Sequence, residues 1–270
     1  MNKMTLKEIQ QTELEIMIQF DKIARKYGLK YSLCAGTLLG AVRHQGFIPW
    51  DDDIDVSMPR PDYEKLIRLN RKQKLWPAHL HLSSFEDGTL DSPYCKLFDS
   101  RTKIVEHNYT QKDVSSLWID IFPVDGLPAD VKKKKSHYRW AMTLCRMNVA
   151  AVVKNGYGSS RLVILIKDIF MKPFAKLVGR RRIAKSQRKH ALKYRYGKAP
   201  ECGMVTWAYD GPGQALTVSE YETLVELPFE GHSFFAMSAW DKNLSGIFGD
   251  YMQLPPEEDR ITHELEAYRV

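Results

Sequence analysis

The chain has 270 residues, of which 44% are hydrophobic and 27% are charged, and its formal net charge is +7. This composition excludes wholesale disorder, and the length allows one large domain or two small ones. No uncharged apolar run reaches the ~18–20 residues of a membrane span, and the N-terminal stretch lacks the apolar block of a signal peptide. Four widely spaced cysteines without a CxxC pair argue against a zinc site and a disulfide framework, so we expect a cytoplasmic protein.

Hydrophobic periodicity and turn residues predict the elements in chain order. The first half is expected to hold a helix over 6–27 ended by Gly28, a strand over 29–34, a helix from Gly36-Thr37, a strand over 53–56, a helix from Pro59 to Leu69, and short strands over 79–125. The second half is expected to hold a solvated turn at Lys132–Lys135, a basic helical stretch over 136–196 interrupted at Gly156, Gly158 and Pro173, and loops with a helix near Trp240–Phe248.

This order of elements predicts an α+β fold, with a mixed sheet, flanking helices and a basic helical insert. We expect a catalytic core over residues 1–130 and a helical insert over 131–200. Residues 201–270 are expected to pack back on the core and complete the site.

The densest chemistry in the sequence is the run Trp50-Asp51-Asp52-Asp53-Ile54-Asp55-Val56. On a strand, alternate side chains share a face, so Asp51, Asp53 and Asp55 are expected to point the same way. Carboxylates this close repel each other unless a cation lies between them, and Mg²⁺ or Mn²⁺ suits oxygen ligands. The alternative is a solvated acidic turn, but the interleaved Ile and Val favour the metal site.

A further acid, Asp120, lies in the apolar run Trp118-Ile119-Asp120-Ile121-Phe122. An acid among bulky apolar residues is costly unless it binds something. If its strand neighbours the strand of Asp55, the acids form a metal site suited to phosphoryl transfer. The alternative is an outward-facing strand residue.

The segment Gly36-Thr37-Leu38-Leu39-Gly40 follows an expected strand and begins an expected helix. Backbone N–H groups at such a helix start favour phosphate, and the Thr37 hydroxyl adds a donor. Arg43 and Lys96 are further candidates for phosphate contacts. A glycine turn capped by Thr37, and a strand lysine that reaches solvent at Lys96, are the structural alternatives.

Residues 31–56, from Tyr31-Ser32-Leu33-Cys34-Ala35-Gly36-Thr37 to Asp51-Asp52-Asp53-Ile54-Asp55-Val56, resemble the signature of the LicD family of bacterial phosphocholine transferases. Residues 118–125 resemble the second acidic motif of that family. Its C-terminal motif resembles Phe248-Gly249-Asp250-Tyr251-Met252 and the stretch from Leu254 to His263. Residues 136–209 match no motif.

The resemblance implies a nucleotidyltransferase-like fold, in which Gly36-Thr37, the pair Asp53 and Asp55, and the third acid Asp120 fill the catalytic places, with Asp51 as a further ligand. It also implies transfer of phosphocholine from CDP-choline to a sugar hydroxyl of teichoic acid, lipopolysaccharide or a similar glycan, with release of CMP. Trp50, Trp118, Tyr251, Arg260 and His263 are then candidates for substrate contacts, and core packing is the alternative for each aromatic ring.

Residues 161–198 carry thirteen Lys or Arg and one acid, a charge of +12, whereas the rest of the chain carries −5. Many apolar residues lie within the same segment, which is typical of a helix on an anionic membrane surface. An amphipathic helix packed on the core explains the pattern equally well. Nucleic acid is not expected as a partner, because no nucleic-acid motif accompanies the charge.

Two other functions stay open at this point. The same scaffold can transfer another phospho-group, such as a sugar phosphate, phosphoglycerol or phosphoribitol, from a different nucleotide donor. A non-catalytic binding protein is disfavoured, because it has no need of Asp53, Asp55 and Asp120 together. The expected place of the reaction is the cytoplasm, at the inner face of the membrane if the acceptor is linked to a lipid.

Overall fold

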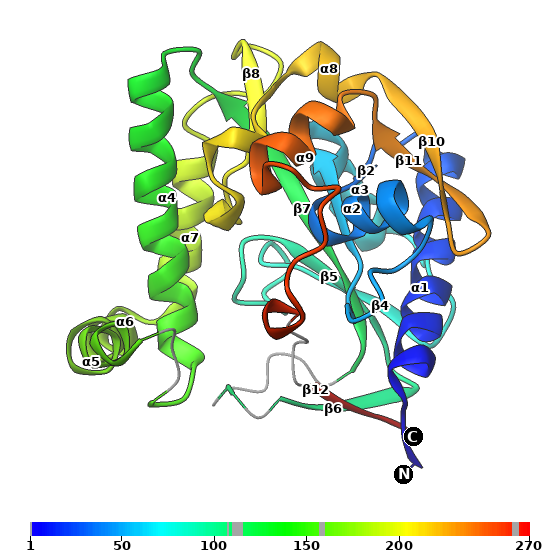
Figure 1. Ribbon diagram of the computed structural model, residues 1–270, viewed down its shortest axis with the longest axis horizontal. Helices are drawn as coiled ribbons and strands as arrows, with labels where there is room; N and C mark the ends of the chain where they lie inside the picture. The colour runs from blue at the N-terminus through cyan, green and yellow to red at the C-terminus, as the bar shows by residue number, and fades with distance from the viewer. Residues whose placement is uncertain (1, 107, 110–115, 157–159, 261–264) are drawn as a thin grey trace.

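A seven-stranded mixed sheet lies at the centre of the fold (Figure 1). The computed structural model describes residues 2–106, 108–109, 116–156, 160–260 and 265–270. Its main path runs β2-β3-β7-β5-β4, and β8 and β9 join it through β7. The strands are β2 (Ser32–Leu33), β3 (Asp55–Pro59), β4 (Leu80–Ser83), β5 (Cys95–Asp99), β7 (Trp118–Leu127), β8 (Glu201–Met204) and β9 (Leu216–Thr217). Strands β3 and β7 pair in parallel, and the other strand pairs of this sheet are antiparallel.

The ten-residue strand β7 is the centre of this sheet. Its first half pairs with β5, its second half pairs with β8, and β3 pairs along its other edge. Ile119 and Ile121 of β7 are fully buried, which accounts for the apolar run that the sequence shows around Asp120. One strand therefore connects the N-terminal part of the fold to the segment after residue 200.

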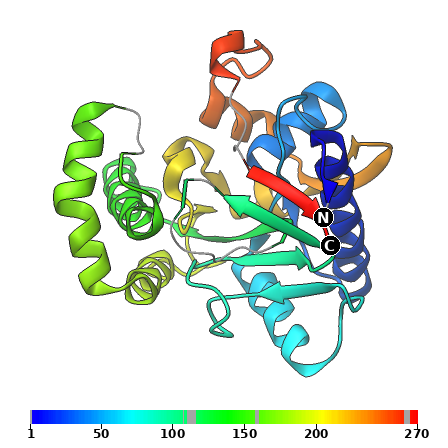
Figure 2. The same ribbon diagram turned by 90° about the horizontal axis from the view of Figure 1, so that it is seen from below.

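Two smaller sheets complete the β structure. Strand β12 (Leu265–Arg269) lies between β1 (Asn2–Lys3) and β6 (Thr102–Glu106), which brings the two ends of the chain together (Figure 2). The hairpin β10 (Leu224–Phe229) and β11 (His232–Met237) turns through Glu230-Gly231, both with positive φ. The loops expected after residue 201 thus include a regular hairpin.

Helices α1 (Leu6–Tyr27), α2 (Ala35–His44), α3 (Arg60–Lys72), α8 (Val218–Glu222) and α9 (Trp240–Phe248) surround the main sheet. The apolar stripe of α1 is buried, Thr5 and Glu8 form a capping box at its start, and Gly28 ends it with φ 57°. The bounds of α1 and α9 agree with the predicted 6–27 and 240–248. The α+β fold class is confirmed.

The basic helical stretch forms a separate layer beside β8 (Figure 1). It contains α4 (Val131–Val152), α5 (Arg161–Ile166), the π-helical turn η1 (Lys167–Met171), α6 (Lys172–Val178) and α7 (Arg180–Ala191). No helix within the described ranges is long and apolar enough to cross a membrane. The four cysteines are buried free thiols.

Two predictions about this stretch are wrong. Lys132–Lys135 is not a turn but the first turn of α4, because the Asp130 side chain accepts a hydrogen bond from the Lys133 N–H and caps the helix. Pro173 does not interrupt the helix, because it lies in the first turn of α6, where proline is tolerated. The break comes instead at Gly179, with φ 87°. Gly158 lies outside the described residues.

Candidate active site

Three charged residues on adjacent strands define the centre of the candidate site. Asp55 of β3 is in register with Asp120 of β7, and Asp120 is in register with Lys96 of β5. Residues in register on neighbouring strands place their side chains on the same face of the sheet. The predicted adjacency of the two acidic strands is therefore confirmed, and a lysine lies next to them.

The Asp120 carboxylate is held by two donors. Lys96 Nζ lies 2.8 Å from Asp120 Oδ1, and Trp118 Nε1–H donates to Asp120 Oδ2 at 2.9 Å. Lys96 Nζ also lies 4.1 Å from the centre of the Trp118 ring. Lys96 and Asp120 are only 6% and 8% exposed, so this charge pair is nearly removed from water. Lys96 thus supplies a positive charge inside the acidic site.

The strand-face argument for the acidic run is wrong in one respect. Strand β3 begins only at Asp55, so Asp51 and Asp53 lie in the preceding loop and do not alternate along a strand. The loop is attached to α1, where the Gln10 amide donates to the Asp51 carbonyl at 2.8 Å. Asp52, which lies between Asp51 and Asp53 in this loop, is buried.

The loop still brings its acids close to Asp55. Burial, together with the charges of Asp53, Asp120 and Asp51, raises the pKa of Asp55 well above its ordinary value. Asp210, in the turn η2 (Ala208–Asp210), contributes to the same effect, and burial raises its own pKa to about 6. The structure therefore gathers the four predicted acids and adds Asp210, which the sequence reasoning missed.

Glu13 of α1 is a second acid that the sequence reasoning missed. Its side chain is 1% exposed, and burial, followed by the charges of Asp53 and Asp52, raises its pKa well above the ordinary value. A signal was present, because Glu13 stands on the buried stripe of α1, four residues after Ile9 and three before Ile16. An acid at a core position of an amphipathic helix indicates a polar neighbour in the fold.

Helix α2 begins beside these acids. Thr37 is buried, and its hydroxyl accepts a hydrogen bond from the Asp55 N–H at 2.8 Å, which ties the helix start to the acidic strand. Cys34 precedes the helix without a side-chain capping bond, and Ala35 has φ 47°, an uncommon value for a residue with a Cβ. The first amides of α2 are therefore suited to an anionic ligand.

Gly36 lies close to the Asp51 carboxylate, so a side chain at this position would displace that carboxylate. A Cβ at this position would lie 2.8 Å from Asp51 Oδ2, too near for an ordinary contact. We predict that G36A lowers kcat/KM by about tenfold to a hundredfold, because Asp51 must shift. The free energy of unfolding should stay within about 1 kcal/mol, since alanine favours the helix. A turnover assay checks the effect on kcat/KM, and urea unfolding checks the effect on the free energy of unfolding. Unchanged turnover of G36A would contradict this role of Gly36.

The other candidate residues form two pairs. The Arg43 guanidinium donates to the Tyr251 carbonyl at 2.8 Å and so links α2 to the C-terminal segment. The Arg260 guanidinium lies 4.9 Å from the centre of the Trp50 ring. Trp50 and Trp118 therefore each present a ring face to a cation of the protein, Arg260 or Lys96. His263 lies outside the described residues.

The donor chemistry fits a hard divalent cation, since every acid named here offers carboxylate oxygens and their mutual repulsion calls for positive charge. In the part of the chain that the structure describes, no group of three His, Cys, Asp or Glu side chains is already arranged around a metal position. Asp120 is instead directed to Lys96 and Trp118. The metal ligands thus stay a prediction.

Comparisons with known proteins agree with this geometry. Residues 28–144 match the family model described as "LicD/FKTN/FKRP, nucleotidyltransferase domain". Over 278 aligned positions, covering 99% of both chains, the protein is 32% identical to the lipopolysaccharide cholinephosphotransferase LicD of Haemophilus influenzae. An uncharacterized protein of Rickettsia prowazekii is 46% identical over 48 residues, which is 18% of each chain. The matched domain includes Asp51, Asp53, Asp55, Lys96 and Asp120, and the chain belongs to the LicD family.

Proposed function

We propose that the protein is a metal-dependent cholinephosphotransferase that moves phosphocholine from CDP-choline to a sugar hydroxyl of a cell-surface glycan and releases CMP. The observation that carries this proposal is the full-length similarity to a lipopolysaccharide cholinephosphotransferase, together with the acids gathered at Asp55. The similarity to this relative favours lipopolysaccharide as the acceptor, ahead of teichoic acid or a capsule precursor. We place the reaction on the cytoplasmic side, where nucleotide donors are made.

In the proposed reaction, the sugar oxygen forms a bond to the phosphorus that carries choline, and the bond from that phosphorus to the CMP oxygen breaks. Asp120 takes the proton of the hydroxyl, or orients it, at its carboxylate. A divalent cation bound by Asp51, Asp53, Asp55 and Asp120 would offset the charge that develops on CMP. Residues of this chain supply the remaining positive charge and orientation.

The amides at the start of α2, with Gly36 and Thr37, are proposed to face the phosphates. Lys96, which pairs with Asp120, is proposed to exchange that carboxylate for a phosphate oxygen when the donor binds. Arg43 is proposed to approach the same phosphates from the far end of α2. The ring faces of Trp50 and Trp118, which already accept protein cations, suit a trimethylammonium group. Tyr251, Arg260 and His263 are proposed to close the site from the C-terminal side.

Metal removal tests the cofactor. We predict that dialysis against EDTA lowers turnover at least about a hundredfold, and that Mg²⁺ or Mn²⁺ restores it, because the phosphates and the acids repel each other without a cation. A second readout does not depend on activity: Mg²⁺ should raise the Tm of the wild type but leave that of D55N unchanged. Full turnover after chelation would contradict the metal assignment.

The donor is tested by CMP release from CDP-choline, CDP-ethanolamine, CDP-glycerol and CDP-ribitol, each with Mg²⁺. Metal-dependent CMP release from CDP-choline alone is the expected result. Calorimetry with the same donors covers the case in which the acceptor is needed for turnover. If the protein selectively binds a donor other than CDP-choline, the phosphocholine assignment is wrong and the same scaffold transfers another phospho-group.

A further inference from the structure

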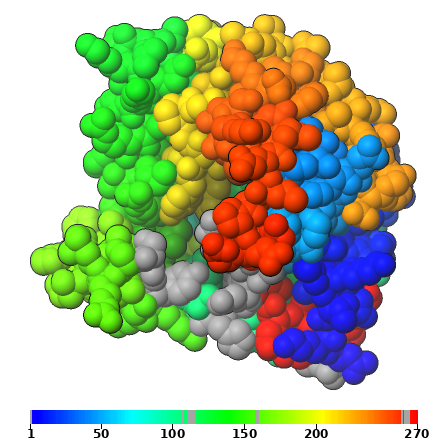
Figure 3. Space-filling view, viewed as in Figure 1, coloured from blue at the N-terminus to red at the C-terminus, as the bar shows by residue number. Residues whose placement is uncertain are grey.

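The helical stretch α5–η1–α6, residues 161–178, presents an apolar face to solvent. Figure 2 shows it lengthwise at the edge of the molecule, and Figure 3 shows the same segment as a lobe at the lower left. Of the 18 large apolar side chains that are exposed among the described residues, eight belong to this stretch. They are Leu162, Val163, Leu165, Ile166, Ile169, Phe170, Phe174 and Leu177, with Phe170 69% and Leu177 81% exposed.

This helical stretch is attached to the protein through its polar side. Lys172, only 6% exposed, donates to the Val153 carbonyl at 2.7 Å, and Asp168 accepts from the Gly156 N–H at 2.8 Å. Ala175 is fully buried, but α5 and η1 have no buried residue. The idea that this helix packs on the core through its apolar face is therefore wrong. Burying the polar side and exposing the apolar side calls for an apolar partner outside the chain.

A basic cavity of about 1000 Å³ opens where α6 meets α7. Its lining includes one acid, Asp91, and five cationic residues, which are Lys176, Arg180, Arg181, Arg182 and Lys185. Leu177, the most exposed apolar residue of the stretch, lines the same cavity. Apolar surface and positive charge thus adjoin each other at this end of the helix.

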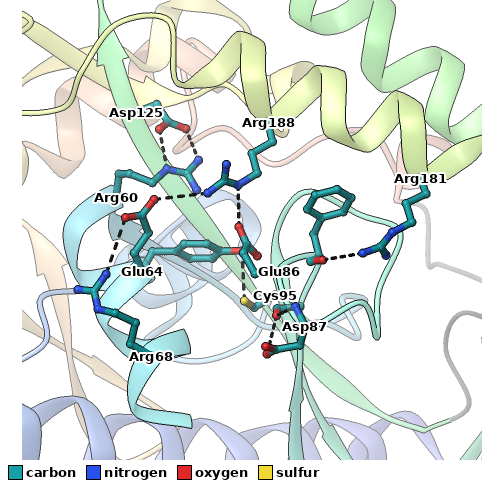
Figure 4. A network of polar contacts seen from close by, with 12 residues as sticks. Arg60, Glu64, Arg68, Glu86, Asp87, Cys95, Asp125, Arg181 and Arg188 are labelled. Atoms are coloured by element: carbon teal, nitrogen blue, oxygen red, sulfur yellow. Dashed lines mark hydrogen bonds and ion pairs between the residues drawn. The ribbon is translucent and has the colours of Figure 1, made fainter. Parts of the chain in front are cut away.

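The basic residues of α6 and α7 include two groups that differ in their partners. Arg181 and Arg188 face the body of the protein (Figure 4), where Arg181 pairs with Asp91 and Arg188 pairs with Glu86. In contrast, Lys176, Arg182 and Lys185 form no ion pair with any residue that the structure describes. Arg181 and Arg188 thus hold α7 in place, whereas Lys176, Arg182 and Lys185 leave positive charge for an external anion.

We infer that the face of residues 161–178 docks on an anionic phospholipid bilayer, with the large apolar side chains in the acyl region and a headgroup phosphate in the basic cavity. Exposed Leu and Phe beside Lys and Arg are the chemistry that recognises such a surface. A second copy of this chain fits less well, because each copy carries +12 over residues 161–198 and the two would repel. The inference does not depend on which nucleotide donor the enzyme uses.

Vesicle flotation of the full chain tests the inference. The wild type should float with vesicles of phosphatidylcholine and phosphatidylglycerol, and should bind vesicles of phosphatidylcholine alone at least tenfold more weakly. F170S/L177S should lower partitioning at least tenfold, and K176Q/R182Q/K185Q by about a hundredfold at low salt, at about fivefold per cation. V131S/W140S, which changes two exposed apolar residues on α4, should bind as the wild type does.

Since Phe170 and Leu177 are exposed, F170S/L177S should keep the wild-type Tm and the wild-type CMP release in solution. This separates failure of docking from failure of the proposed chemistry. Equal flotation of F170S/L177S and the wild type, or no flotation of the wild type, would overturn the inference. Self-association that F170S/L177S abolishes, without vesicle binding by the wild type, would make a second copy the partner instead. Equal binding to both kinds of vesicle would overturn the role of the cavity.

Discussion

D55N is expected to lower kcat at least about a thousandfold and to leave the protein folded. Asp55 lies in register with Asp120 and near Asp51 and Asp53, so its carboxylate is central to any cation shared by these acids. Without that carboxylate, the charge that develops on the leaving CMP is no longer offset. CMP release under saturating Mg²⁺ and CDP-choline measures the effect, and D53N and D120N should behave in the same way.

The same substitution should not destabilise the protein in the absence of metal. Asp55 lies among like charges, so replacing its carboxylate by a neutral amide removes repulsion, and the Tm without metal should be equal or higher. E226Q is a matched control, because Glu226 forms a surface ion pair with Arg25 and should keep full activity when changed. A folded D55N protein with wild-type turnover would falsify the site assignment.

Loss of the Arg60–Asp125 pair is expected to have the largest effect on stability. Arg60 Nε and Nη2 donate to the two Asp125 oxygens at 2.7 Å and 2.6 Å, and the residues are 5% and 1% exposed (Figure 4). The pair joins the start of α3 to the second half of β7. Burial by itself lowers the pKa of the Arg60 guanidinium, but the Asp125 carboxylate outweighs this effect and raises that pKa above its ordinary value, so Arg60 stays charged.

We predict that R60M and D125L each lower the free energy of unfolding by about 3–5 kcal/mol, because each leaves one buried charge without its partner. R60M/D125L should lose much less than the sum of the two, since it leaves neither charge behind. Urea unfolding of the three variants measures this. The exposed pair Lys3–Glu266 serves as the control, and E266Q should cost less than about 1 kcal/mol. Additive losses would contradict the proposed coupling.

The centre of the active site could be predicted because its acids stand in patterns that local rules recognise. Asp55 and Asp120 interrupt apolar strand runs, and a pair of such acids on neighbouring strands has few structural explanations. Lys96 is predictable as a phosphate contact for the same reason, because it is a cation among apolar residues. Its pairing with Asp120 needed the register of β5 and β7, which the sequence does not reveal.

Other parts depended on tertiary context. Glu13 and Asp210 reach the site from α1 and from a turn after β8, far from the acidic motif in the chain. The hairpin β10–β11 was not predicted, because its turn is Glu-Gly instead of Asn-Gly and Pro228 weakens the strand signal. Lys132–Lys135 resembled a solvated turn because four adjacent like charges hide the cap at Asp130.

The arrangement of β1, β12 and β6 has a consequence for how the protein is made. β12 is the middle strand, yet it is synthesised 159 residues after the end of β6 and 262 residues after the end of β1. Until Leu265–Arg269 leaves the ribosome, the facing edges of β1 and β6 stay without the strand that pairs them. Open edges of this kind are sites at which other chains can pair, so the nascent protein is exposed to misassociation until β12 has been made. Ribosome-bound chains stopped before residue 265 should therefore be cleaved by protease within β6, whereas released chains should resist.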